Sequence, residues 1–573
     1  MDYFCGCFPS ASISEDETMK KVEDSSALKL SAVGRAAYDS LKFKHAWHHH
    51  VQWNVTSGTV IGSLHQTPSA HVFTSTADPK QGHTDWFPQK MCDIMSKTTT
   101  WCDVMSLGPP DGIFIDKIKE ALKNIAKTAN LSEKPIIIRM MFGNIVGMPT
   151  NCNSLIKKLT ADLPSDANIM LWVGAWRKGA SWNHAKLIAV DGRYLHTGGH
   201  NLWDYHYLKN NPVHDLSVEL EGRVAHDGHL FANEQWVHIE RKQSGCVGQC
   251  AEKIPDGLPL VWHNRVIISE YPIGKATEFA PLYNPDIVPR YDAPIGSVPI
   301  ISLGRQGALT IKNRPADDAF LAMIGAAKTI IRMSLQDLGP VCIPNTKISL
   351  PGLKWPKPIL NALAKAIFVR GVDVEIVLSN PGSIPGGLGL TDACYGNGWT
   401  CVDVAAEIVK RIKKLFPNAS DDKLRQLVRE NLRVCFIRHA KKTTYQDKKN
   451  IGNHSKYFII DDVASYVGSQ NLYMCDLAEW GVLIDDEAET KKMIQDFWNP
   501  LWQASYTAED CDVDEVMDGL DIDRDGENVN SFTADGRKKL EEAAKMQAMN
   551  GGGIDAELYS KEDDPASAAQ TEQ

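Results

Sequence analysis

The sequence predicts an α/β protein with two tandem halves of similar architecture, each with layered sheets flanked by helices. The main observation is a duplicated constellation, in which every member recurs 270 positions later in the chain. The first copy consists of His184, Lys186, Asp191, Gly198 and Asn201, and the second of His454, Lys456, Asp461, Gly468 and Asn471. The second observation is that apolar, strand-like runs alternate with amphipathic helical segments in both halves.

Composition divides the chain into five segments. We expect an irregular N-terminal segment (1–50), a first α/β domain (51–245), a Pro-rich bridge (246–297), a second α/β domain (298–505) and an acidic, largely disordered tail (506–573). Closely spaced prolines exclude a regular helix from the bridge. In the tail we expect one short helix, around 537–549.

Individual elements follow from local periodicity. The first half should contain an amphipathic helix over 113–126, and strands over 135–143, 169–176 and 216–222. In the second half, apolar spacing predicts helices over 320–329 and 358–371.

The repeated motif suits the binding of a tetrahedral anion. His184 and Lys186 are two residues apart on an alternating apolar segment, so a β-strand would direct both side chains to one face. Gly198 would let the backbone approach a ligand closely, and Asn201 would supply an amide donor. An imidazole, an ammonium group and an amide that converge on one point can bind an anion, and two copies make one complete site.

The motifs resemble the signature of a known family. The pattern HxKxxxxD, followed after six further residues by G(G/S)xN, occurs twice and resembles that of the phospholipase D superfamily, in particular its two-domain microbial branch. The resemblance runs from about residue 55 to 505, and further segments that carry it are 100–122, 135–143, 211–222, 319–338, 372–381 and 468–485. It implies two phospholipase D-like domains related by pseudo-two-fold symmetry, with the active site at their interface.

Residue chemistry points to cleavage of a phosphodiester. Its negative charge repels nucleophiles, so a catalyst must neutralise the oxygens, supply an attacking atom and protonate the leaving group. One histidine can attack to give a phosphohistidine while the other donates a proton. Two lysines and two asparagines would hold the oxygens, so we expect neither a metal nor a cofactor. The resemblance implies that His184 is the nucleophile and His454 the acid, which spacing alone does not distinguish.

Each imidazole needs a carboxylate on its other nitrogen. Asp191 and Asp461 lie five residues past their lysines, beyond reach of their own histidines on a strand, and we expect them to be structural. The resemblance points instead to Asp215 as the partner of His184 and to Glu479 as the partner of His454. Glu479 departs from the family, which has Asp there, but Glu can orient an imidazole if the backbone retreats.

Aromatic residues crowd the motifs and suggest a substrate class. Aromatic faces can bind a quaternary ammonium group, although core packing explains single aromatics equally well. The expected substrate-binding residues are Trp203, Tyr205, Tyr395 and Tyr473, of which Tyr395 lies in a Gly-rich loop (380–399).

These features and the resemblance together predict a phospholipase D. It would hydrolyse phosphatidylcholine or a related glycerophospholipid to phosphatidate and free head group, with transfer of phosphatidyl to small alcohols as a second reaction. The alternatives are a phosphatidyltransferase that makes phosphatidylserine or cardiolipin, a phospholipase D-type nuclease, and a catalytically silent lipid-binding protein.

Charge and composition indicate where the protein acts. The net charge of −10 argues against nucleic acid as a partner. We expect a monomer that meets its phospholipid substrate at a membrane surface. No apolar run approaches 18 residues and the N-terminus lacks a secretory pattern, which predicts a cytoplasmic location. Cys5 and Cys7 are compatible with dual S-acylation, or are two exposed cysteines on a frayed terminus.

Two segments could bind metal, and both have simpler explanations. Residues 521–526 (DIDRDG) resemble the first half of a calcium loop, but position twelve is Phe532 rather than Glu, and an acceptor-rich turn explains them equally well. The histidines at 45, 48, 49 and 50 are expected to form a solvated turn or helix end.

Overall fold

A computed structural model gives the fold of most of the chain. It describes residues 28–75, 86–130, 134–145, 149–178, 181–208, 212–244, 268–271, 280–288, 295–307, 314–342, 347–349, 354–385, 394–395, 397–473 and 476–525.

Both halves contribute to a single sheet, which has 16 strands in the described part of the chain. The first half supplies β1 (Trp53–Thr67), β2 (Trp101–Ser106), β3 (Ile136–Gly143), β4 (Ile169–Lys178), β5 (Ser181–Trp182), β6 (Leu187–Val190), β7 (Tyr194–Gly198), β8 (Asp215–Gly222) and β9 (Ile268–Tyr271). The second half supplies β10 (Val298–Gln306), β11 (Ile330–Leu335), β12 (Asp373–Leu378), β15 (Leu432–Phe436), β16 (Lys456–Ile460), β17 (Ala464–Gly468) and β18 (Ala478–Ile484). A separate pair is formed by β13 (Ile384–Pro385) and β14 (Cys394–Tyr395).

The strand order confirms the predicted duplication. From the centre outward, the first half reads β1-β8-β7-β6-β2-β3-β4 and the second reads β10-β18-β17-β16-β11-β12-β15. The halves join where β1 pairs antiparallel with β10, with Trp53 opposite Leu303 and Gly58 opposite Val298. The predicted tandem α/β architecture is therefore correct, and the two halves share one continuous sheet.

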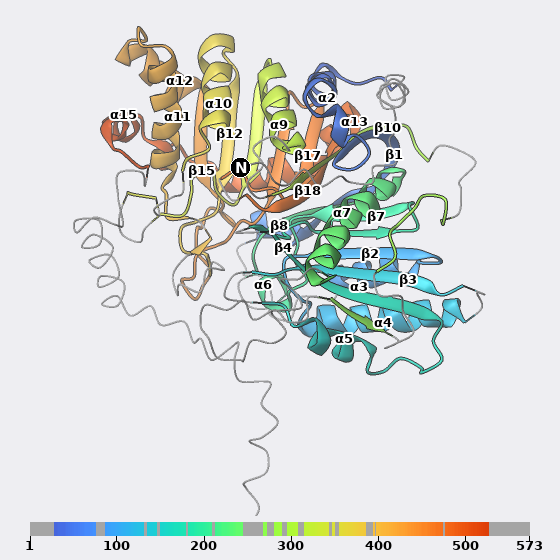
Figure 1. Cartoon of the computed structure of the whole chain (residues 1–573). Helices are drawn as coiled ribbons and strands as arrows, with labels where there is room; N and C mark the ends of the chain where they lie inside the picture. Colours follow the sequence, from blue (N-terminus) through green and yellow to red (C-terminus); the bar gives the residue numbers. More distant parts are fainter. Residues whose placement is uncertain are drawn as a thin grey trace, which may run out of the picture.

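Helices pack in layers against the faces of the sheet (Figure 1). The first half contains α3 (Trp86–Ser96), α4 (Gly112–Ala129), α5 (Cys152–Thr160), α6 (Asp204–Tyr207) and α7 (Val224–Ser244). The second half contains α9 (Pro315–Ala326), α10 (Lys357–Arg370), α11 (Cys401–Leu415), α12 (Asp421–Asn431), α13 (Glu487–Met493), η4 (Ile494–Trp498) and α14 (Asn499–Ser505). The helices predicted over 113–126 and 358–371 are confirmed as α4 and α10, whereas α9 ends before 329 because β11 begins at Ile330.

Three large apolar cores hold the described layers together, beside one small cluster around Trp101. One core lies under α3, α4 and α5 of the first half, and another under α9 to α12 of the second. These two helical groups lie at opposite ends of the molecule (Figure 1). The third core combines strand residues of both halves with α7, η4 and α14, for example Trp236 and Phe497, which are fully buried. Both halves thus share a core, which fixes their relative position.

The N-terminal segment is more regular than the sequence predicts. Residues Ala32–His45 form helix α2, which Ser31 caps by accepting hydrogen bonds from the amides of Val33 and Gly34. The Ser31 amide itself donates to Asp485, at 2.7 Å. A short turn, η2 (Ala46–His48), follows. The expectation of an irregular segment is therefore wrong for this helix, because its partner lies hundreds of residues away in the chain.

The four histidines around the end of α2 are less solvated than predicted. His45 is the last residue of α2, as the expected helix end requires, but it is buried, and its Nε2 lies 2.8 Å from Asp318 at the start of α9. His49 is also buried, with its ring centroid 4.5 Å from that of Trp53 of β1, whereas His48 and His50 are half-buried. The His45 contact attaches the end of α2 to the second half.

The described C-terminal residues are folded, where the sequence predicts disorder from residue 506. They form η5 (Ala508–Cys511), α15 (Val513–Asp518) and η6 (Gly519–Asp521). Arg524, in the DIDRDG segment, is fully buried and donates to Asp403 and Glu407 of α11. Arg524 therefore attaches the last described residues to α11. The helix predicted over 537–549 lies outside the described residues, as do Cys5 and Cys7.

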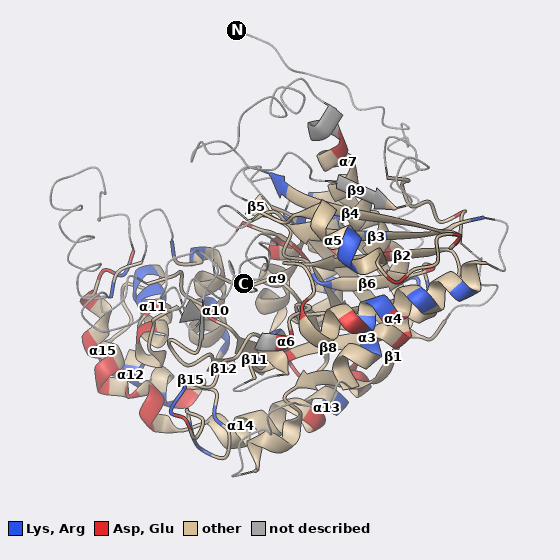
Figure 2. Cartoon of the chain, turned by 90° about the horizontal axis from the view of Figure 1, so that it is seen from below, with Lys and Arg blue, Asp and Glu red and all other residues tan. Residues whose placement is uncertain are grey.

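Charged residues are distributed unevenly over the outer helices (Figure 2). Lysines lie along α4 and acidic residues gather on α15, whereas α12 carries both signs. Among the described residues, no helix combines the length and apolar character that crossing a bilayer requires.

Candidate active site

An asparagine in front of each motif histidine anchors the motif to the neighbouring strand. The Asn183 amide donates to the carbonyl of Ser106 at the end of β2, at 2.9 Å. Its counterpart Asn453 donates to the carbonyl of Leu335 at the end of β11, at 3.1 Å. Sequence reasoning assigned no role to this pair, although both asparagines obey the same 270-residue spacing as the motifs.

Each motif is also bonded to the opposite half of the molecule. The backbone amide of His184 donates to the carbonyl of Ala478 at the start of β18, at 2.8 Å. In the same way, the amide of His454 donates to the carbonyl of His214, just before β8, at 2.7 Å. Each histidine therefore lies beside the first residues of the other half's strand, and the two motifs meet at the interface between the halves.

This exchange corrects the predicted pairing of histidines and carboxylates. Nδ1 of His184 lies 2.9 Å from Oε2 of Glu479, and Nδ1 of His454 lies 2.6 Å from Oδ2 of Asp215. The sequence-based pairing of Asp215 with His184 and of Glu479 with His454 is wrong, because it assumed that each carboxylate bonds to the histidine of its own half of the chain. The backbone bonds instead place Glu479 next to His184 and Asp215 next to His454.

The motif lysines are buried and directed by their own motif. The Lys186 ammonium donates to the His184 carbonyl at 2.7 Å, and Lys456 donates likewise to the His454 carbonyl. Burial lowers the pKa of Lys186 to about 7 and that of Lys456 to about 8. The two ammonium groups also repel each other, so an anion bound between them would stabilise both charges.

The imidazoles are also buried and favour the neutral form. Burial lowers the pKa of His184 to about 4, against the opposing effect of Glu479. Burial, followed by the charge of Lys456, holds the pKa of His454 well below its ordinary value. Because each Nδ1 faces a carboxylate, each neutral ring carries its proton on Nδ1 and directs Nε2 away from that carboxylate.

The two asparagines of the motif lie in different environments. The side-chain oxygen of Asn201 accepts a hydrogen bond from the amide of Leu107, at 3.4 Å. The side-chain amide of Asn471 donates to the hydroxyl of Tyr473 at 3.1 Å, and Gln336 donates to the same hydroxyl at 3.2 Å. Sequence reasoning missed Gln336.

The motif glycines are required by strand packing. A Cβ on Gly198 would collide with the carbonyl of Leu216 and with Ser217 on β8. On Gly468 a Cβ would collide with the Tyr466 hydroxyl and with Gly481 of β18. The glycines therefore permit close approach of neighbouring strands, and their approach to a ligand stays a prediction.

Asp191 and Asp461 bond to backbone amides away from the imidazoles. Asp191 accepts from the amides of Thr99, Thr100 and Trp101, at 2.7 to 2.9 Å. Asp461 accepts from the amides of Lys328, Thr329 and Ile330, at 2.8 to 3.1 Å. Both aspartates adopt a left-handed backbone, with φ of 51° and 53°. Each aspartate thus ties the turn after its motif strand to the start of the neighbouring strand.

We expect Asp461→Asn to reduce stability and to retain most activity. Asn tolerates the left-handed conformation, but its NH₂ group would face backbone donors, and the lost bonds should cost about 1–3 kcal/mol of unfolding free energy. Thermal unfolding and turnover of the folded fraction provide the measurement. A fully stable but inactive variant would contradict the structural role.

The predicted substrate aromatics are only partly described. Trp203 is half-buried, packs against Gly108 and donates its indole N–H to the carbonyl of Pro109 at 3.0 Å. Tyr473 touches the site through Asn471. The side chains of Tyr205 and Tyr395 lie outside the described residues, so all four remain predictions.

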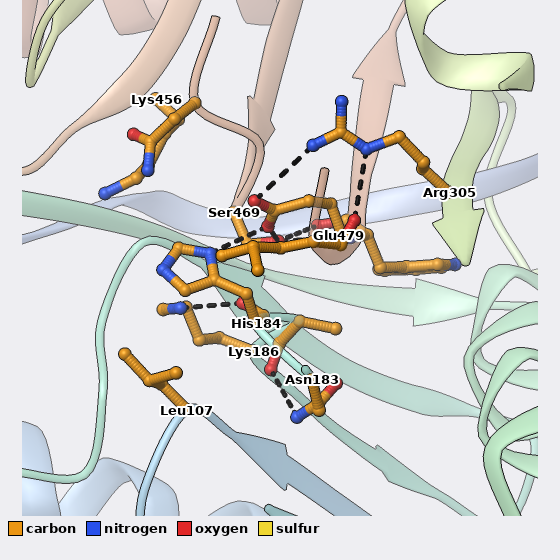
Figure 3. Close-up of polar contacts among 12 residues, drawn as sticks. Leu107, Asn183, His184, Lys186, Arg305, Lys456, Ser469 and Glu479 are labelled. Carbon is orange, nitrogen blue, oxygen red and sulfur yellow. Dashed lines mark hydrogen bonds and ion pairs between the residues drawn. The ribbon is translucent and has the colours of Figure 1, made fainter. Parts of the chain in front are cut away.

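Sequence reasoning also missed the groups around the two carboxylates. Glu479 lies beside Arg305 and Ser469 (Figure 3). Asp215 accepts hydrogen bonds from the Tyr207 hydroxyl, at 3.0 Å, and from the Leu216 amide, at 2.8 Å. Arg305 and Tyr207 lie outside the repeated motif, so the duplication gave no signal for them.

Comparisons with known proteins agree with the motifs. Residues 323–502 match a family model described as "Cardiolipin synthase, PLD-like domain". The chain is 24% identical to a phospholipase D of Streptomyces antibioticus over 477 residues. This alignment covers 79% of this chain and 82% of the Streptomyces protein. A solved structure of phosphatidylserine synthase from Haemophilus influenzae Rd KW20 covers 86% of this chain and 96% of its own, with 12% identity and a TM-score of 0.45.

Proposed function

Because this chain belongs to the phospholipase D superfamily, we propose that it is a phospholipase D that cleaves a glycerophospholipid to phosphatidate and free head group. The observation that carries the proposal is the pair of crossed histidine–carboxylate contacts, which brings two imidazoles and two buried lysines to one interface. The kinship with a phospholipase D supports an enzyme that acts on phosphodiester bonds. Phosphatidylcholine or a related lipid is the substrate that the sequence favours.

In the first step, Nε2 of His184 attacks the phosphorus and forms an N–P bond. The bond between phosphorus and the head-group oxygen breaks, and that oxygen takes a proton from Nε2 of protonated His454. In the second step, His454 removes a proton from water, the water oxygen attacks phosphorus, and the N–P bond to His184 breaks. Phosphatidate leaves, and both histidines return to their starting protonation states.

The two histidine–carboxylate pairs differ in a way that suits these roles. Burial raises the pKa of Asp215, so its pair with His454 tends to retain a proton that it can deliver. Burial also acts to raise the pKa of Glu479, but the contact with His184 and the charge of Arg305 outweigh it and lower the pKa. An ionised Glu479 increases the basicity of His184, as the attacking group requires. The phosphate charge, once bound between the lysines, favours protonation of His454.

The second candidate is a phosphatidyltransferase. It would use the same phosphohistidine but release it to an alcohol rather than to water. The family model that matches the second half is described as a cardiolipin synthase domain, which keeps this alternative open. The two functions differ only in the acceptor of the second step.

Incubation with mixed phospholipid vesicles plus ethanol, followed by lipid mass spectrometry, tests the proposal. We expect phosphatidate and phosphatidylethanol, with loss of one head-group class. Dominant formation of cardiolipin or phosphatidylserine, when phosphatidylglycerol or serine is added, would favour the transferase. Unchanged lipids would contradict both functions.

The lysines predict a decline in substrate capture at alkaline pH. In the empty site Lys186 and Lys456 lose their protons as the pH rises through their pKa values of about 7 and 8. The free enzyme then binds the phosphate anion less well, so kcat/KM should fall above neutral pH. A bound phosphate raises both pKa values, so kcat should fall only at higher pH. A soluble chromogenic phosphodiester gives both profiles, and coincident alkaline limbs would contradict this assignment.

A further inference from the structure

The two halves of the site have diverged at the residue that faces each carboxylate. In the antiparallel pairing of β10 with β18, Arg305 is opposite Glu479. At the corresponding position of the first half, β1 places Thr67 opposite Asp215. The Thr67 hydroxyl bonds to His200 at 2.6 Å. A guanidinium group thus accompanies one carboxylate, and a hydroxyl side chain takes its place beside the other.

Arg305 is buried and held by three separate contacts. Its Nε donates to the carbonyl of Leu477 at 3.1 Å, and Nη1 donates to Asp317 at 3.1 Å. The third contact is an ion pair in which Nη2 lies 3.8 Å from Oε1 of Glu479. Figure 3 shows the guanidinium directed at Glu479 from the side opposite His184. The arginine is therefore preorganised to act on this carboxylate.

A second difference between the halves also favours the ionised form of Glu479. The Ser469 hydroxyl donates to Oε2 of Glu479 at 2.6 Å and accepts from the Trp480 amide at 3.0 Å. The first half has Gly199 at this position, where a Cβ would collide with Oδ1 of Asp215. A serine at this position thus donates to Glu479, whereas the equivalent position is closed to a side chain in the first half, and Asp215 takes its hydroxyl donor from Tyr207 instead.

The groups that face Glu479 are predominantly basic. His184 and Lys186 face it from the first half. From the second half it is faced by Arg305, Lys456 and the Tyr466 hydroxyl, with Asp317 behind Arg305. Lys186 and Lys456 face both carboxylates and each carboxylate has one hydroxyl donor, so the Arg305 guanidinium is the charged group that distinguishes Glu479 from Asp215.

We propose that Arg305 is a positioning residue that keeps Glu479 ionised and thereby makes His184, rather than His454, the attacking histidine. The assignment of an attacking histidine rests on the proposed function, whereas the ionisation of Glu479 can be measured without any substrate. Arg305 contacts neither imidazole in these interactions and acts through Glu479.

The test compares Arg305→Gln and Arg305→Met with the charge-preserving Arg305→Lys. Arg314→Gln is the matched control, because Arg314 forms an ion pair with Asp476 at 3.2 Å, away from Glu479. Imidazole ¹H–¹⁵N spectra of the full chain follow the titration of His184, whose signals are identified by their loss in His184→Gln. Thermal unfolding establishes which variants are folded.

Removal of the guanidinium should raise the pKa of Glu479, so the His184–Glu479 pair stays protonated to a higher pH. In Arg305→Gln and Arg305→Met the titration of His184, and the acid limb of kcat/KM on a soluble phosphodiester, should move up by about one pH unit or more. Arg305→Lys keeps the positive charge, so its titration should lie close to that of the wild type, with only a small upward shift. Arg314→Gln should titrate as the wild type does.

Superimposable titrations of the wild type and a folded Arg305→Gln or Arg305→Met variant would overturn the inference. If both neutral variants fail to fold, Arg305→Lys decides. The lysine charge is more distant from Glu479 and more hydrated, so the titration of His184 should still move up, but by less than in a neutral variant. An unshifted titration in Arg305→Lys would then overturn the role of Arg305 in ionising Glu479. A shifted titration in a protein that cleaves no phosphodiester would support the role of Arg305 in ionising Glu479 and refute the proposed function alone.

Discussion

Replacement of either motif histidine should abolish turnover. In the proposed mechanism His184→Ala removes the attacking nitrogen and His454→Ala removes the proton donor, so each should lower kcat by about 10⁴-fold or more. The double variant should be scarcely worse than either single variant, because residues that act as one unit are not additive. The expectation follows from the exchange of strands, which gives each histidine a carboxylate from the other half.

The measurement is the rate of cleavage of a soluble phosphodiester, expressed per amount of folded protein. His71→Ala is the matched control, because His71 is exposed and far from both motifs in sequence. Retention of about half the activity in either single variant would mean that the halves work as independent sites, which one shared site forbids.

Neutral replacements of the orienting carboxylates should have the next largest effect. Glu479→Gln and Asp215→Asn preserve size, but an amide can favour the wrong imidazole tautomer, so turnover should fall by about 10²- to 10⁴-fold. Because Asp215 and Glu479 are both buried, each change also removes one charge from the interface.

The crossed pairing makes a sharper prediction for the same variants. Imidazole ¹H–¹⁵N spectra should show that Glu479→Gln changes the tautomer of His184 and leaves His454 as in the wild type. Asp215→Asn should do the reverse. If Glu479→Gln perturbed His454 instead, the pairing read from the structure would be wrong and the sequence-based pairing would be right.

The sequence predicts the parts of this site that are repeated. Two copies at one fixed spacing identify the histidines, lysines, asparagines and motif aspartates, and local periodicity identifies α4 and α10. These signals come from local periodicity or from the comparison of the chain with itself. They can therefore be found without knowing which distant strands pair with each other. The same spacing would also have revealed Asn183 and Asn453 as anchors.

The crossed carboxylates depend on contacts that the sequence does not encode locally. A bond from the His184 amide to Ala478 joins residues almost 300 positions apart, and no periodicity reports such a bridge. Arg305 has Thr67 as its structural counterpart, so a search for repeats passes over both. Helix α2 was missed for a related reason, since Ser31 finds its partner Asp485 in the other half of the chain.

Identification of the covalent intermediate would show which histidine attacks the phosphorus. The full chain is mixed with a radiolabelled phosphodiester for a short time, quenched without acid, digested and mapped, because phosphohistidine is acid-labile. We expect label on His184, its absence from His184→Ala, and its retention on His184 in Arg314→Gln. Label on His454, or turnover without any labelled histidine, would contradict the proposed mechanism.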